Sequence, residues 1–293
     1  MLGENIKVHF AGTDGEKSAV ISLDLAGVKY RLFSCYKFIE TKKPGDDMVD
    51  KSGVLKIEQG NMKHIIMDSG LFTLMFGAGK DQRQTRKSLA IWQDKLIQFV
   101  QQNNLCATCV EIDCQKVLGV EEAWWFRQRM RDKLKNRQIN VFHFEDGKKG
   151  LDRLIEFSDY IALSIPELRI IKSKTFREDT RQLVNYIKNR KPEIDIHLLG
   201  CTDSKILNEN SCCTSADSTS WLAGLWYGSV GIKGKRVDRI KKECKEVYRE
   251  SILRKAELYH YKLSEGKIDR IQNGIICAKI HKKIYEKAAG SQN

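Results

Sequence analysis

Short runs rich in β-branched and aromatic residues alternate along the chain with segments whose apolar residues recur every three or four positions. The helical spacing is clearest in the segment 82–103, where apolar residues stand at Leu89, Trp92, Leu96 and Val100. The strand-like runs lie at residues 6–12, 28–36, 64–70, 107–113, 139–145, 159–164, 195–200 and 212–217. Strands that alternate with helices form a parallel sheet, and eight of them close into a barrel. The pattern therefore predicts an α/β protein with a (β/α)8 TIM barrel.

The length of 293 residues fits one barrel with a short extension, because a TIM barrel takes about 250 residues. We expect the barrel to occupy residues 1–230. Residues 231–293 are expected to form a basic helical extension that packs on or beside the barrel. Apolar spacing places the helices of this extension at 237–263 and 268–287.

Hydropathy and cysteine content indicate a cytoplasmic location. No segment reaches the roughly 18 uncharged apolar residues needed to cross a bilayer, and the start of the chain lacks the pattern of a signal peptide. The nine cysteines then fit free thiols in a reducing compartment. The pair Cys106-x-x-Cys109 has metal or redox spacing, but its apolar surroundings favour packing, and the second such pair of a zinc site is missing.

The charge of the chain favours a polyanionic partner. Fifty-one Lys and Arg against 38 Asp and Glu leave a net charge of +13, and much of the excess lies between Gly231 and the C-terminus. Such an excess neutralises phosphates and releases counterions when a nucleic acid binds. A solvated helical face is the simpler interpretation of the same charges, and only the motifs described next favour nucleic acid.

The expected carboxyl ends of the strands carry four carboxylates and one histidine. These ends form the catalytic face of a TIM barrel. The side chains are those of Asp68, Asp113, His143, Glu145 and Asp217. Each aspartate alone has a structural interpretation as the cap of the next helix. Together they suit a displacement at an anomeric carbon, in which one carboxylate attacks and another moves protons to and from the leaving group.

Several motifs resemble the tRNA-guanine transglycosylase superfamily, and most closely its DNA 7-deazaguanine transglycosylase branch of phages and bacteria. The segment MDSGLFT (67–73) resembles the Asp-Ser-Gly-x-Phe motif of the superfamily. The segments LFSCYKF (32–38), VFHFED (141–146) and DYIALS (159–164) are similar to motifs of the DNA branch. HLLGCTDSKIL (197–207) and TSADSTSWLAGLWYG (214–228) resemble the final strands with their Asp-Ser-Thr-Ser-Trp motif. The resemblance extends from Gly12 to Gly228.

The resemblance implies a role for each of these residues. Asp217 matches the nucleophile and Asp68 the general acid/base, while Asp113 matches the residue that recognises the base. Further residues would contact the base or the phosphates: Ser69, Gly70, Phe72, His143 and Glu145 at the base, and Lys233, Lys235 and Arg236 at the phosphates. Phe72 either stacks on the base or fills the core, and the three cations either bind phosphates or lie in a solvated loop.

The sequence departs from the tRNA-acting enzymes in ways that favour DNA. Their Cys-x-Cys-x-x-Cys…His zinc site has no counterpart, because Cys244, Cys277, His260 and His281 have other spacings. LSIPEL (163–168) replaces their Gly-Gly-Leu run after strand 6, and the glycine of the Phe-His-x-Gly-Glu motif is missing. These two changes leave the preferred base open, whereas the missing zinc site favours DNA. We therefore expect a pentosyltransferase that replaces guanine in DNA with a 7-deazaguanine base such as preQ0, without a metal or other cofactor.

Three alternatives stay open at this point. In the first, the chemistry is the same and the substrate is tRNA instead of DNA. In the second, the chain is a metal-dependent barrel hydrolase with Asp68, His143, His197 and Asp217 as ligands, although the His-x-His pair typical of strand 1 in such enzymes is absent. In the third, the chain is a non-catalytic nucleic-acid-binding barrel whose aspartates only cap helices.

Overall fold

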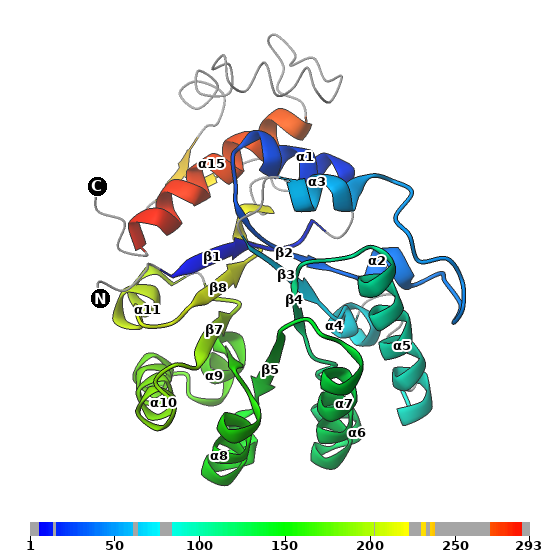
Figure 1. Cartoon of the computed structure of the whole chain (residues 1–293). Helices are drawn as coiled ribbons and strands as arrows, with labels where there is room; N and C mark the ends of the chain where they lie inside the picture. The colour runs from blue at the N-terminus through cyan, green and yellow to red at the C-terminus, as the bar shows by residue number, and fades with distance from the viewer. Residues whose placement is uncertain are drawn as a thin grey trace.

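Eight parallel strands close into a barrel in the order of the sequence (Figure 1). This computed structural model describes residues 6–13, 16–60, 64–76, 84–201, 203–222, 230–232, 235–237 and 270–288. The barrel strands are β1 (Lys7–Phe10), β2 (Tyr30–Ser34), β3 (His64–Asp68), β4 (Thr108–Val110), β5 (Gln138–Phe142), β6 (Tyr160–Ser164), β7 (Asp195–Leu199) and β8 (Ser215–Ser218). Each falls within or across one of the eight expected runs, so the predicted (β/α)8 fold is confirmed.

Helices surround the strands and shield them from solvent (Figure 1). Those up to β4 are α1 (Lys17–Leu25), α2 (Tyr36–Ile39), α3 (Val54–Gly60), α4 (Leu71–Phe76) and α5 (Arg86–Gln102). Those after β4 are α6 (Gln115–Leu118), α7 (Val120–Lys133), the 3-10 turn η1 (Phe144–Asp146), α8 (Gly147–Phe157), α9 (Ile165–Ile171), α10 (Phe176–Arg190) and α11 (Ser204–Glu209). The short helices α2, α3, α4, α6 and α9 were not expected from the periodicity, because they are too short for an apolar repeat to develop.

Helix α5 illustrates how local sequence forms these elements. Thr85 caps its first turn, since Thr85 Oγ1 accepts a hydrogen bond of 3.1 Å from the backbone N–H of Ser88. The four apolar residues of its repeat, Leu89, Trp92, Leu96 and Val100, are all buried against the barrel. The expected helical spacing is therefore also the spacing of its core face.

Strand alternation determines which side chains enter the barrel. Successive side chains of a strand point to opposite faces, so His64, Ile66 and Asp68 of β3 share one face. His64 Nδ1 lies 2.8 Å from His9 Nε2 of β1, across the barrel interior. Asp68, two pleats further along β3, therefore faces the same interior at the carboxyl end of the strand.

The C-terminal helix α15 (Arg270–Ala288) completes the outer layer beside α1 and α11 (Figure 1). Ile275 and Ile276 on this helix are buried in the same core cluster as α1. Tyr285 is also buried, and its hydroxyl donates a hydrogen bond of 2.9 Å to Ser218 Oγ of β8. The helix thus covers the barrel between its first and last βα units.

Val237, the expected first residue of the helix 237–263, lies in a strand. Val230–Ile232 (β9) and Lys235–Val237 (β10) form an antiparallel pair instead. The antiparallel pairing satisfies backbone groups of these two strands. Lys235 and Arg236 lie in β10, whereas Lys233 and residues 238–263 lie outside the described residues.

None of the helices in the described part of the chain combines the length and the apolar composition that crossing a membrane requires.

Candidate active site at the carboxyl end of the barrel

Asp217 stands near the end of β8 and is held by two hydrogen bonds. Its Oδ1 accepts the backbone N–H of Gly200 at 2.6 Å and lies 3.2 Å from His197 Nε2 of β7. Both of these contacts, which come from described residues, involve the same oxygen, Oδ1. The Asp217 side chain keeps 12% of its surface exposed at the carboxyl end of β8.

Asp68 ends β3 on the interior face of the barrel, and two strands, β1 and β2, lie between β3 and β8 around the mouth. Its Oδ2 accepts the backbone N–H of Gly70 at 2.9 Å, which turns the chain from the strand into α4. Because α4 begins at Leu71, this contact belongs to the turn before the helix. It orients the carboxylate and leaves it half-buried at the mouth.

Ser69 and Gly70 form the turn after Asp68. The Ser69 carbonyl accepts hydrogen bonds from Trp92 Nε1 at 2.8 Å and from the Cys35 thiol at 3.1 Å. Gly70 has φ +74°, and an added Cβ there would lie 3.0 Å from Tyr36 Cβ. Glycine permits this left-handed backbone and the close approach of Tyr36. The close approach that Gly70 permits is therefore between this turn and Tyr36 of α2, within the chain itself.

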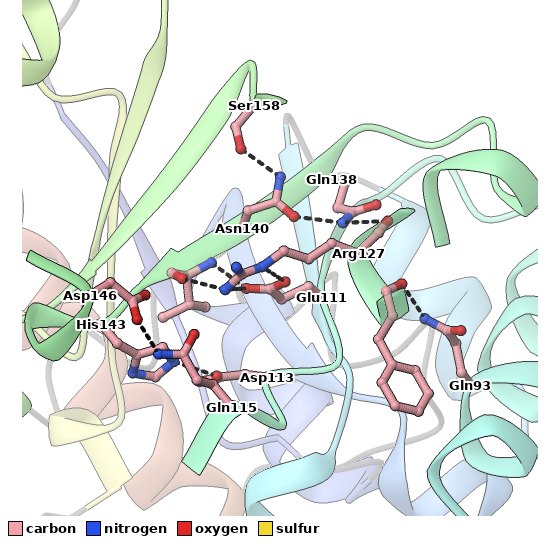
Figure 2. A network of polar contacts seen from close by, with 12 residues as sticks. Gln93, Glu111, Asp113, Gln115, Arg127, Gln138, Asn140, His143, Asp146 and Ser158 are labelled. Carbon is pink, nitrogen blue, oxygen red and sulfur yellow. Dashed lines mark hydrogen bonds and ion pairs between the residues drawn. The ribbon is translucent and has the colours of Figure 1, made fainter. Parts of the chain in front are cut away.

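His143, after β5, lies between two carboxylates from neighbouring βα units. Its Nε2 is 2.6 Å from Asp113 Oδ1, and its Nδ1 is 3.3 Å from Glu167 Oε2 of α9 (Figure 2 shows the contact with Asp113). The second contact is an ion pair that does not meet hydrogen-bond geometry. Lys116 extends the cluster, because its ammonium donates to Glu167 Oε1 at 2.8 Å.

These contacts keep His143 positively charged. Burial of the ring by itself lowers the pKa, but the interactions with Asp113 and Glu167 outweigh it and raise the pKa of His143 to about 10. The same contact with His143, together with Lys116, lowers the pKa of Glu167 although burial opposes it. A charged cluster of His143, Asp113, Glu167 and Lys116 therefore lies on one side of the mouth. The Asp113 side chain in this cluster is one-third exposed.

A buried ion pair supports the strand that carries Asp113. The Arg127 guanidinium of α7 donates to Glu111 Oε2 at 2.5 Å and to the Val141 carbonyl at 2.9 Å (Figure 2). Glu111 Oε1 accepts the Val141 backbone N–H at 2.6 Å. Because β4 has only three residues, the Glu111 carboxylate continues the pairing with β5 and holds the segment leading to Asp113.

Glu145 and Phe72 lie further from the centre of the site. Glu145 is exposed and accepts a hydrogen bond of 3.4 Å from Gln115 Nε2, which also donates to Asp146 Oδ1 at 2.7 Å (Figure 2 shows Gln115 and Asp146). Phe72 on α4 is 74% exposed and therefore does not fill the core.

The metal-dependent alternative requires its proposed ligands to lie close enough together to bind one ion. Among the described residues, no group of three or more His, Cys, Asp and Glu side chains is arranged to hold a metal ion. His143 and His197 each pair with a different carboxylate, at 2.6 and 3.2 Å. Cys106 is exposed and Cys109 is buried in β4, where burial raises the pKa of its thiol to about 12.

Three contributors to the site were missed from the sequence: Gly200, Lys116 and Glu167. Glu167 stands in LSIPEL, the segment that departs from the family pattern. A signal for it existed, since Ser164 caps α9 by accepting the Glu167 N–H at 3.3 Å, with Pro166 in the first turn. Such a cap places Glu167 on the first turn of a helix that starts at the barrel mouth.

The chain has no match among protein-family models or among the curated proteins searched. Fold and site together define it as a (β/α)8 barrel whose carboxyl-terminal mouth gathers carboxylates from four of its βα units: Asp68, Asp113, Glu167 and Asp217.

Proposed function

We propose that the protein is a base-exchange transglycosylase, which replaces guanine in DNA with a 7-deazaguanine base through a covalent intermediate on Asp217. The observation that carries this proposal is the way Asp217 is held. Both hydrogen bonds described for it end on Oδ1, and Oδ2 is left to attack a C1′ atom presented at the mouth. A carboxylate held in this way suits nucleophilic displacement at a glycosidic carbon.

The reaction proceeds in two displacements. A guanine nucleotide leaves the base stack and enters the barrel mouth, as chemistry on a base in a duplex requires. Asp217 Oδ2 bonds to C1′ while the bond from C1′ to the base breaks, and Asp68 gives the leaving guanine a proton. A 7-deazaguanine then enters, gives its N9 proton to Asp68 and displaces Asp217 from C1′. Asp68 and Asp217 thereby return to their starting states.

Asp113 and His143 supply the contacts to the base. Asp113 Oδ1 is occupied by His143, and the one-third exposed carboxylate presents its remaining acceptor positions to the mouth. A guanine edge carries the N1–H and the exocyclic amine as donors, which a fixed carboxylate accepts and an adenine edge does not match. The contact with the positively charged His143 holds the Asp113 carboxylate in place.

Incubation with labelled preQ0 and either duplex DNA or unmodified tRNA tests the proposal, with nucleoside mass spectrometry as the readout. We expect label in DNA, and loss of at least about 10³-fold in rate for Asp217→Asn, since a nucleophile has been removed. Asp195→Asn is a matched control: Asp195 starts β7 at the opposite end of the barrel, and we expect normal exchange.

Each other outcome has a distinct meaning. Label in tRNA alone would keep the chemistry and change the substrate. Activity that a chelator abolishes would favour the metal-dependent alternative. Label in neither nucleic acid, with several 7-deazaguanines supplied, would refute exchange and return the aspartates to capping roles.

A further inference from the structure

A chain of buried polar side chains runs from Asp217 along the barrel interior towards its amino-terminal end. His197 Nε2 lies 3.2 Å from Asp217 Oδ1, and His197 Nδ1 lies 2.5 Å from Ser215 Oγ. Ser215 Oγ lies 2.5 Å from the Tyr160 hydroxyl. Three adjacent strands, β7, β8 and β6, each supply one member, and all three are almost completely buried. We call His197, Ser215 and Tyr160 the relay.

The carboxylate at one end determines the direction of every hydrogen bond in the relay. An ionised carboxylate only accepts, so His197 must carry its proton on Nε2 and donate it to Asp217. The Nδ1 atom of a neutral His197 is then an acceptor, and the Ser215 hydroxyl must donate to it. The oxygen of Ser215 is left to accept from the Tyr160 hydroxyl, which completes a chain of donors that all point towards Asp217.

The surroundings of the relay favour this single arrangement. Burial raises the pKa of Tyr160, although its hydrogen bond to Ser215 opposes this, so the hydroxyl keeps the proton that it donates. His9 is the neighbouring ring, with a centroid 6.4 Å from that of His197. Burial, followed by the effect of His197 and His64, holds the pKa of His9 well below its usual value, so His9 adds no positive charge beside the relay.

The far end of the relay opens on a cavity at the amino-terminal mouth. Tyr160 lines this cavity, which has a volume of about 380 Å³ and is also lined by Lys7, Arg137 and Lys188. The Arg137 guanidinium lies 4.7 Å from the centre of the Tyr160 ring. The relay therefore extends through the barrel, from a cation-lined cavity at one end to the candidate nucleophile at the other.

We propose that Ser215 and Tyr160, acting through His197, are positioning residues for Asp217, a role that rests on the proposed function. The relay fixes Oδ1 so that Oδ2 faces C1′. It also stabilises the carboxylate each time Asp217 is released from the glycosyl–enzyme intermediate. Donors to a carboxylate favour its ionised form, so they assist the step in which Asp217 departs more than the step in which it attacks.

Tyr160→Phe and Ser215→Ala test the relay, with labelled preQ0 and DNA as substrates. One hydrogen bond corresponds to a rate effect of about 3- to 10-fold. We expect kcat to fall by this factor and KM for DNA to fall with it, because the second displacement is the step that slows. The glycosyl–enzyme should accumulate in intact-protein mass spectra.

Tyr285→Phe is the matched control. It removes one buried tyrosine hydroxyl that donates to Ser218, the neighbour of Asp217 on β8, without touching the relay. We expect its kcat and its level of glycosyl–enzyme to equal those of the wild type. If Tyr160→Phe and Ser215→Ala behave like Tyr285→Phe in kcat and in the level of glycosyl–enzyme, the relay has no positioning role and the proposal is overturned.

Nitrogen-15 NMR of the histidine rings tests the direction of the relay without any activity. We expect His197 to carry its proton on Nε2 in the wild type, and its Nδ1 signal to shift in Ser215→Ala. A proton on Nδ1 in the wild type would overturn the relay. A wild type that transfers no base but shows the expected tautomer would refute the proposed function alone, so the two failures are distinguishable.

Discussion

His143 Nε2 and Asp113 Oδ1 lie 2.6 Å apart, although the two residues follow different strands and are separated by 30 positions in the chain. The contact joins the βα units of β4 and β5 at the barrel mouth (Figure 2). With Glu167 on the other side of the ring, it makes a buried imidazolium part of the site. The charge on His143 then holds the carboxylate that is proposed to recognise the base.

The raised pKa of His143 predicts how stability depends on pH. The ordinary value of 6.5 applies to the unfolded chain and the value of about 10 to the folded one, so the folded state binds the proton more tightly. The stabilisation from His143 is complete below pH 6.5 and is lost as the pH rises towards 10, by at most about 1.4 kcal/mol per pH unit. Urea unfolding of the wild type and His143→Gln between pH 6 and 10 measures it. A difference between the two proteins that stays constant over this range would contradict the charged pair.

The buried pair of Arg127 and Glu111 predicts a large effect on stability. Arg127→Met leaves the Glu111 carboxylate buried without its partner, and we expect a loss of about 3–5 kcal/mol in the free energy of unfolding. Arg131→Met, on the exposed side of the same helix, should change it by less than about 0.5 kcal/mol. Denaturant titration compares them, and equal effects would mean that the Arg127 pair does not stabilise the fold.

Gly70 and Gly53 allow the effect of crowding to be separated from that of backbone conformation. Both have a positive φ, +74° and +77°, but an added Cβ contacts Tyr36 and Ser34 at Gly70 and nothing within 4 Å at Gly53. Gly53→Ala should cost about 1 kcal/mol from backbone strain alone. Gly70→Ala should cost about 1–3 kcal/mol more because of the close contacts, as measured by urea unfolding. A Gly70→Ala cost no greater than that of Gly53→Ala would show that α2 can move aside.

Phe72 predicts a functional effect without a structural one. With 74% of its surface exposed on α4, Phe72→Ala should change the free energy of unfolding by less than about 0.5 kcal/mol. If the ring stacks on a base, KM for the nucleic acid should rise about 5-fold or more, since stacking contributes about 1–3 kcal/mol per base. Ile91→Ala, at an exposed apolar position on α5, is the control and should leave KM unchanged. An unchanged KM for Phe72→Ala would remove Phe72 from the site.

The sequence alone determined the barrel and the end of the barrel at which the carboxylates lie. Alternating strand and helix patterns require parallel strands, and Asp68, Asp113 and Asp217 follow β-rich runs. The carboxyl ends of parallel strands in a barrel share one mouth, so the placement of these residues follows from strand order without any coordinates. The same periodicity placed the core face of α5, because a 17-residue helix contains several apolar repeats.

Only the tertiary structure decided which side chains contact one another. The pairing of His143 with Asp113 and Glu167, and of Asp217 with Gly200 and His197, depends on separations of 2.6 to 3.3 Å between different βα units. Periodicity assigns a residue to an element and a face, whereas a hydrogen bond depends on loop path and rotamer to a fraction of an ångström. Exposure of Phe72 was undecided in the sequence for the same reason, because α4 is too short for its six residues to show which face is buried.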